Sequence, residues 1–130
     1  MNIRSLQRGL RYCGKVAAVR QTYHVFESES FFLVLSFARA RSRRGSGYFN
    51  LVDKAAVDYV RQRVGGTRGV TANDVLTRAR RTGRVATRLV ALNVLYVLVA
   101  LGQARITRAG EHRQLYFAVR SAPARRTRAR

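Results

Sequence analysis

Acidic side chains are scarce in this chain. Only six of its 130 residues are Asp or Glu, against 26 Lys and Arg, so the formal net charge is +20. A compact chain with that charge repels itself and needs a polyanion nearby, which is most often nucleic acid. Only Lys15 and Lys54 are lysines, and the planar guanidinium of the many arginines can hold a phosphate or a guanine edge with two hydrogen bonds. The charge therefore predicts nucleic-acid contact, with a membrane surface or a purely compositional bias as alternatives.

Cysteine is almost absent as well. Cys13 stands alone, so no intrachain disulfide is possible, which fits a reducing compartment. One cysteine and two distant histidines, His24 and His112, do not make a zinc finger. We therefore expect no metal and no cofactor.

Long apolar runs are missing too. The longest, residues 89–101, is interrupted by Asn93 and is shorter than the roughly 18–20 residues that span a bilayer. We expect a buried helix there, no membrane partner, and a cytoplasmic or nucleoid-associated protein. Residues 1–26 lack acids and are similar to an organellar transit peptide, but the whole chain is acid-poor, and we favour that interpretation.

The 47% of hydrophobic residues indicates one folded domain with short tails. Residues 1–22 predict a basic helix or arm, because apolar side chains recur there at helical spacing. These side chains are Ile3, Leu6, Leu10, Cys13 and Ala17. At the other end, residues 120–130 predict a disordered basic tail.

Residues 23–52 predict a β-hairpin. Residues 31–37 are aromatic and β-branched, residues 45–47 are a turn signal, and residues 48–52 return as the second strand. A two-stranded ribbon fits a DNA major groove, and a basic arm can wrap phosphates. We expect nucleic-acid contacts from the arginines near the hairpin tip, with a solvated loop as the alternative. These arginines are Arg39, Arg41, Arg43 and Arg44.

Residues 53–119 predict a helix, a short strand, a second helix, a turn, a third helix and a hairpin, which makes the fold class α+β. Asp53 suits the N-cap of the first helix, and Gly65-Gly66 ends it. Thr71 caps the second helix, with Asp74 three residues on as a variant of the capping box.

The third helix is expected from about residue 85 to residue 101. A second hairpin should follow, with strands at residues 103–107 and 114–119 and a polar turn at residues 108–113.

This order of elements resembles the winged helix-turn-helix domain. Ala79 and Gly83, four residues apart, match the family's small residue and turn glycine, and Leu89 and Leu92 match its inward apolar positions. Three positions that are usually apolar in the pattern are polar in this chain, namely Arg78, Thr82 and Arg84. The resemblance implies a winged-helix domain over residues 53–119, with the first hairpin added at its N-terminal side.

The third helix is polar only at its start. From Leu89 onward it is apolar all around, so its C-terminal half must be enclosed or paired with another chain. Its basic first turn can face a major groove, and Arg108 and Arg113 flank the turn of the wing. The predicted nucleic-acid-binding residues of this domain are Arg78, Arg81, Arg84, Thr87, Arg88, Arg108 and Arg113.

We therefore expect a double-stranded DNA-binding protein that is not an enzyme, either a transcriptional regulator or an architectural, chromatin-like protein. An RNA-binding structural component of a ribosome or other ribonucleoprotein is the main rival, and a homodimer through the third and N-terminal helices stays open. A divalent-metal nuclease site built from Glu27, Glu29 and Asp53 is a further alternative, for which no motif fixes the geometry.

Overall fold

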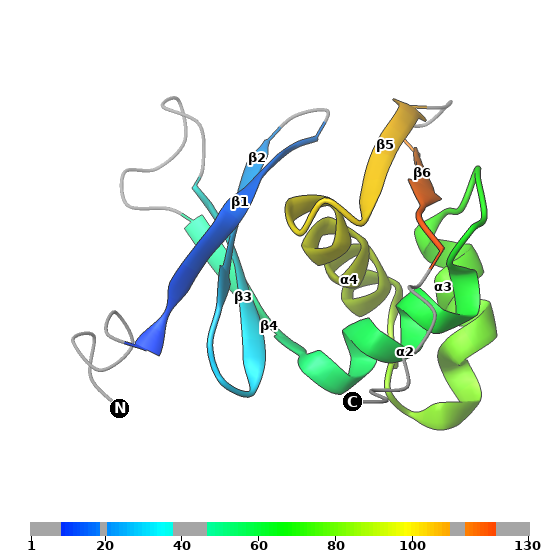
Figure 1. Ribbon diagram of the computed structural model, residues 1–130, viewed down its shortest axis with the longest axis horizontal. Coiled ribbons are helices and arrows are strands. Elements are labelled where there is room, and N and C mark those ends of the chain that lie inside the picture. The colour runs from blue at the N-terminus through cyan, green and yellow to red at the C-terminus, as the bar shows by residue number, and fades with distance from the viewer. Residues whose placement is uncertain (1–8, 19–20, 38–46, 110–113, 122–130) are drawn as a thin grey trace, which may run out of the picture.

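The computed structural model describes residues 9–18, 21–37, 47–109 and 114–121, and within them the fold is mixed α+β. The N-terminal part is a four-stranded antiparallel sheet, and the C-terminal part combines helices with a two-stranded sheet (Figure 1). The elements in chain order are β1 (Arg11–Ala17), β2 (Thr22–Glu27), β3 (Phe31–Phe37), β4 (Gly47–Asp53), α2 (Lys54–Val64), α3 (Ala72–Ala79), the 3-10 turn η1 (Arg80–Thr82), α4 (Arg88–Ala100), β5 (Ala104–Ala109) and β6 (Leu115–Val119).

The four-stranded sheet is a meander in which each strand pairs with the next in sequence. The predicted hairpin at its C-terminal side is confirmed, since β3 and β4 pair from Phe31↔Asp53 to Phe37↔Gly47. Side chains alternate along β3, so that Phe32 and Val34 are buried while Leu33 and Leu35 are partly exposed on the other face. The predicted hairpin tip, with Arg39, Arg41, Arg43 and Arg44, lies outside the described residues.

The prediction of an N-terminal helix is wrong over residues 11–17. Residues 11–17 form β1, which pairs antiparallel with β2 from Arg11↔Glu27 to Ala17↔Thr22. Strand pairing and the burial of Val16, which is 1% exposed, decide the conformation here, although the apolar residues are weakly spaced as in a helix. Gly14 has a φ of +155°, and a Cβ at this position would meet the carbonyl oxygen of Ala100 at 3.2 Å. The glycine therefore permits a close approach of β1 to the end of α4.

The helices α2 and α3 lie where the sequence predicts them. Asp53 precedes α2 in extended conformation without a side-chain cap hydrogen bond, and Gly65 follows its last residue. The capping box of α3 is confirmed: Asp74 Oδ2 accepts from the Thr71 backbone N–H at 2.9 Å, and Thr71 Oγ1 accepts from that of Asp74 at 3.2 Å.

Between α3 and α4 the chain turns tightly. Thr82 Oγ1 donates to the Ala79 carbonyl at 2.7 Å and accepts from the Arg84 N–H at 3.1 Å, while Gly83 adopts a φ of +74°. Val85 is buried but not helical, and α4 begins at Arg88, slightly later than expected. Thr87 sets this start, because its side chain accepts from the Val90 N–H.

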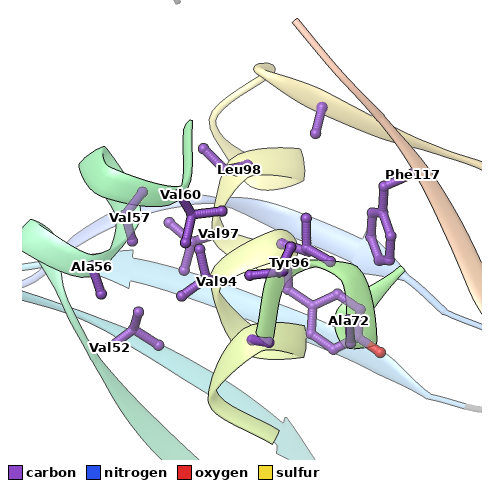
Figure 2. Close-up of a cluster of buried hydrophobic side chains, with 14 of the residues drawn as sticks. Val52, Ala56, Val57, Val60, Ala72, Val94, Tyr96, Val97, Leu98 and Phe117 are labelled. Atoms are coloured by element: carbon purple, nitrogen blue, oxygen red, sulfur yellow. The ribbon is translucent and has the colours of Figure 1, made fainter. Parts of the chain in front are cut away.

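The helix α4 is the centre of the molecule. The four-stranded sheet lies on one side of it, and α2, α3 and the β5–β6 hairpin lie on the other (Figure 1). Figure 2 shows Val57 and Val60 of α2 packed near Val94 and Val97 of α4, all four at most 3% exposed. The prediction that the C-terminal half of this helix is enclosed is confirmed. Most of its apolar surface is covered by the same chain.

Aromatic rings link the two sides of the molecule through α4. Tyr96 of α4 stacks on Tyr23 of β2 with ring centroids 4.4 Å apart, and it also lies 6.3 Å from the ring of Phe117 in β6. Phe117 is fully buried, and its backbone forms a bridge with Val70, which attaches the short extended segment before α3 to the hairpin. Along the described chain, no helix has the length and apolar character needed to cross a membrane.

Candidate nucleic-acid interface

The arginines predicted around α3 and α4 lie on one continuous stretch, residues 78–89, which we call the α3–α4 segment. Arg78, Arg81, Arg84 and Arg88 are all exposed. Arg78 Nη1 donates to the backbone carbonyl of Arg63 at 3.4 Å, which holds that side chain back against the end of α2. Arg81 and Arg84 follow in η1 and the turn, and Arg88 is the first residue of α4.

The start of α4 is basic. The N-terminus of a helix carries partial positive charge, and acidic side chains are normally favoured there. The first turn of α4 contains no acid and begins with Arg88. In the described part of the chain, neither Arg84 nor Arg88 forms an ion pair. A phosphate at this place would neutralise both the arginines and the helix end.

Thr87 has a structural role besides its predicted contact with nucleic acid. Its Oγ1 accepts from the Val90 N–H at 3.1 Å and caps α4, although the exposed hydroxyl can still donate to a partner. The resemblance placed Leu89 at an inward position, and this is wrong, since Leu89 is 54% exposed. Leu92 is packed against the core. The first turn of α4 thus presents a cation and an apolar side chain together, the two kinds of group that read base edges in a major groove.

The predicted wing contacts are only partly placed. Arg108 lies in β5 opposite Tyr116, next to an irregularity in the strand pairing after Ile106. Its side chain lies outside what the structure describes, as does Arg113. The β5–β6 hairpin itself is confirmed.

A second group of arginines comes together only in the fold. Arg68, Arg105 and Arg120 line a hollow of about 520 Å³ at the base of the β5–β6 hairpin, which we call the arginine hollow. Its other lining residues contain no carboxylate; they are Gly66, Gly102, Ala104, Ala118, Val119 and Ser121.

Backbone pairing brings the three arginines together. The Gly66 N–H donates to the Val119 carbonyl at 2.7 Å, and the Arg120 N–H donates to the Gln103 carbonyl at 2.9 Å. The three arginines are far apart in sequence: Arg68 lies between α2 and α3, Arg105 lies in β5, and Arg120 follows β6. No local pattern could have revealed the group.

The carboxylates proposed for a nuclease site are not gathered. Glu27 is occupied by two cations: Lys54 Nζ donates to its Oε2 at 2.7 Å, and Arg11 donates to its Oε1. These hydrogen bonds, that of Lys54 foremost, lower the pKa of Glu27. Over the described ranges, no three His, Cys, Asp or Glu side chains are close enough to hold a metal ion.

Comparison of the chain with protein families, with characterised proteins and with solved structures finds no match.

Proposed function

We propose that the chain binds double-stranded DNA through the α3–α4 segment, as a winged helix-turn-helix protein acting as a regulator or an architectural protein. The main supporting observation is that Arg84 and Arg88 are exposed at the start of a helix whose later turns are buried, and neither forms an ion pair with another described residue. In helix-turn-helix proteins the N-terminal residues of the recognition helix are the ones that contact base edges.

The element order supports this proposal. From α2 onward the chain runs helix, short extended segment, helix, turn, helix and hairpin. The bridge between Val70 and Phe117 ties the extended segment to the hairpin, and strand β5 of the hairpin contacts α4. This order of elements and the attachment of the hairpin to the short extended segment are both expected of a winged helix.

The arginines of the α3–α4 segment would make two kinds of contact with DNA, some to base edges and some to phosphates. Arg84 and Arg88 would meet base edges, where one good bidentate pair contributes about 1–3 kcal/mol of discrimination. Arg78 and Arg81 would meet phosphates, which give affinity without sequence information.

The test uses single alanine variants against a selected preferred duplex and a random duplex. Arg84→Ala and Arg88→Ala should each lose more affinity on the preferred duplex, by about 1–3 kcal/mol. Arg105→Ala is the matched control, because it removes the same charge beyond the opposite end of α4. Equal losses on both duplexes for all three variants would contradict base reading by α4.

The dependence of binding affinity on salt concentration tests whether the partner is a nucleic acid at all. Each neutralised phosphate should add close to 0.9 to the slope of log affinity against log salt. An affinity that is the same at low and high salt would exclude nucleic acid as the principal partner.

The arginine hollow favours one second candidate, an RNA-bound structural protein. The hollow and the α3–α4 segment lie near opposite ends of α4. A partner that touches both must reach around the molecule, which a folded RNA can do through its shape. In a competition between duplex DNA and structured RNA, an RNA preference that Arg105→Ala reduces would select this candidate.

A further inference from the structure

The outer face of the four-stranded sheet is apolar, and within the described residues no other element packs on it. In register across the strands, Tyr12, Phe26, Leu33 and Leu51 form one row, and Lys15, His24, Leu35 and Phe49 form the next. We call these eight residues the outer sheet face. The opposite face packs on α4, and no described element covers the outer one (Figure 1).

The rings on this face lie close together and reach solvent. Tyr12 Oη lies 3.1 Å from His24 Nδ1, and the Tyr12 and Phe26 rings meet edge to face with centroids 5.2 Å apart. Tyr12 is 51% exposed, Phe49 is 60% exposed and Leu51 is 57% exposed. The one other large apolar side chain as exposed in the described structure is Leu89. A gathered, exposed apolar surface of this kind normally marks a binding site.

The charge of the molecule indicates the occupant. The two rows contain Lys15 and no carboxylate; Asp53 follows at the end of β4. A second copy of the chain would bring together two molecules of formal charge +20, each with a lysine in the contact. A polyanion that also carries flat apolar groups is complementary to both properties of the face.

We propose that the outer sheet face binds single-stranded nucleic acid by stacking unpaired bases on Tyr12, His24 and Phe49. In a duplex the faces of the bases are already stacked and are not available, so the ligand must be unpaired. Aromatic side chains on an open surface stack on any base, and a nearby cation meets the phosphates. The neighbouring leucines enlarge the apolar surface under the bases. This site is separate from the α3–α4 segment and does not depend on the duplex binding proposed above.

The test compares a labelled 12-residue oligothymidine with an abasic strand of the same length and charge, in salt high enough to screen phosphate contacts. The wild-type chain should prefer the oligothymidine on the order of tenfold or more, since each stacked base contributes appreciably. The chain has no Trp and six Tyr, so stacking on Tyr12 should also quench the intrinsic tyrosine fluorescence.

Phe49→Leu and Tyr12→Leu separate stacking from apolar docking. Each keeps an apolar side chain but removes a ring, and should reduce the preference for the oligothymidine several-fold. Phe49→Tyr keeps the aromatic ring and should retain the preference for the oligothymidine. Because Tyr12 and Phe49 are exposed, thermal unfolding should show that these variants fold. Arg88→Ala should weaken duplex binding and leave the base-dependent preference unchanged, so the two proposals fail independently.

Three results would overturn the proposal. Equal binding of the abasic strand and the oligothymidine would show that only phosphates are recognised. An unchanged preference for the oligothymidine in both leucine variants would show that the bases do not stack on this face. Self-association of the free chain in sedimentation, abolished by Phe49→Ala, would assign the face to a second copy.

Discussion

Glu27 is the carboxylate on which Lys54 and Arg11 converge. Their hydrogen bonds hold its pKa below the ordinary value of 4.5. A carboxylate whose pKa is lower in the folded chain adds stability above its unfolded pKa, and this stability is lost as the pH falls through its folded pKa. The ion pairs therefore stabilise the junction of β1, β2 and α2 at neutral pH and not in acid.

Glu27→Gln should lower the free energy of unfolding at pH 7, by an amount that shrinks as the pH falls below 4.5. Denaturant unfolding of both proteins over a pH series measures this difference. Glu29→Gln, an exposed carboxylate two residues further on, is the matched control and should have little effect at any pH. A Glu27→Gln effect that is the same at pH 7 and pH 3 would refute the electrostatic cause.

Gly14 is a second residue whose role appears only in the fold. Gly14→Ala would place a side chain in a strained backbone conformation, 3.2 Å from the Ala100 carbonyl oxygen. We expect a loss of about 1–3 kcal/mol in the free energy of unfolding. Gly9→Ala, where an added Cβ meets nothing within 4 Å, should be nearly neutral in the same denaturation experiment. A stable Gly14→Ala protein would mean that β1 can move away from α4.

At the scale of elements, the helix α3 depends on its capping box. Thr71→Ala removes the oxygen that accepts from the Asp74 N–H, and should cost about 0.5–2 kcal/mol of stability. Thr77→Ala, on an exposed position of the same helix, keeps the cap and should be neutral or slightly stabilising. Thermal unfolding compares the two, and equal melting temperatures would show that α3 is held by packing alone.

The elements with local signals were predicted from the sequence. The capping pair Thr71 and Asp74, the glycines after Val64, and the aromatic run of β3 each encode their structure within a few residues. The strand β1 was not predictable in this way, because its conformation follows from pairing with β2 and from the contact of Gly14 with Ala100. Apolar spacing over residues 3–17 pointed to a helix, and tertiary pairing overrode it.

In the candidate site, too, some features follow from local sequence and others only from the fold. Arg84 and Arg88 were proposed as site residues because they stand at the start of an apolar helix in the sequence. The arginine hollow and the outer sheet face were not, since both join side chains from strands and loops that only the fold brings together. The exposure of Leu89 also depends on how α4 is tilted against its neighbours, which the spacing of apolar residues does not fix.

At the scale of the whole molecule, α4 makes the sheet and the helical part mutually dependent. Tyr96 stacks on Tyr23 of the sheet, and Val94 and Val97 are fully buried between the two parts. A fragment of residues 53–121 would expose this apolar side of α4 to water, so we expect it to aggregate or to melt without a cooperative transition. A fragment of residues 1–121 keeps all described elements and should melt cooperatively. Cooperative unfolding of the shorter fragment would show that the helical part is an independent domain.

During synthesis, the four strands leave the ribosome before the helix that covers them. The sheet ends at Asp53, while α4 runs from Arg88 to Ala100. At about 5–20 residues per second, the sheet waits roughly 2–10 s with Val25 and Val34 of its inner face uncovered. In that interval both faces of the nascent sheet are apolar, so the order of elements along the chain makes its unfinished form prone to aggregation.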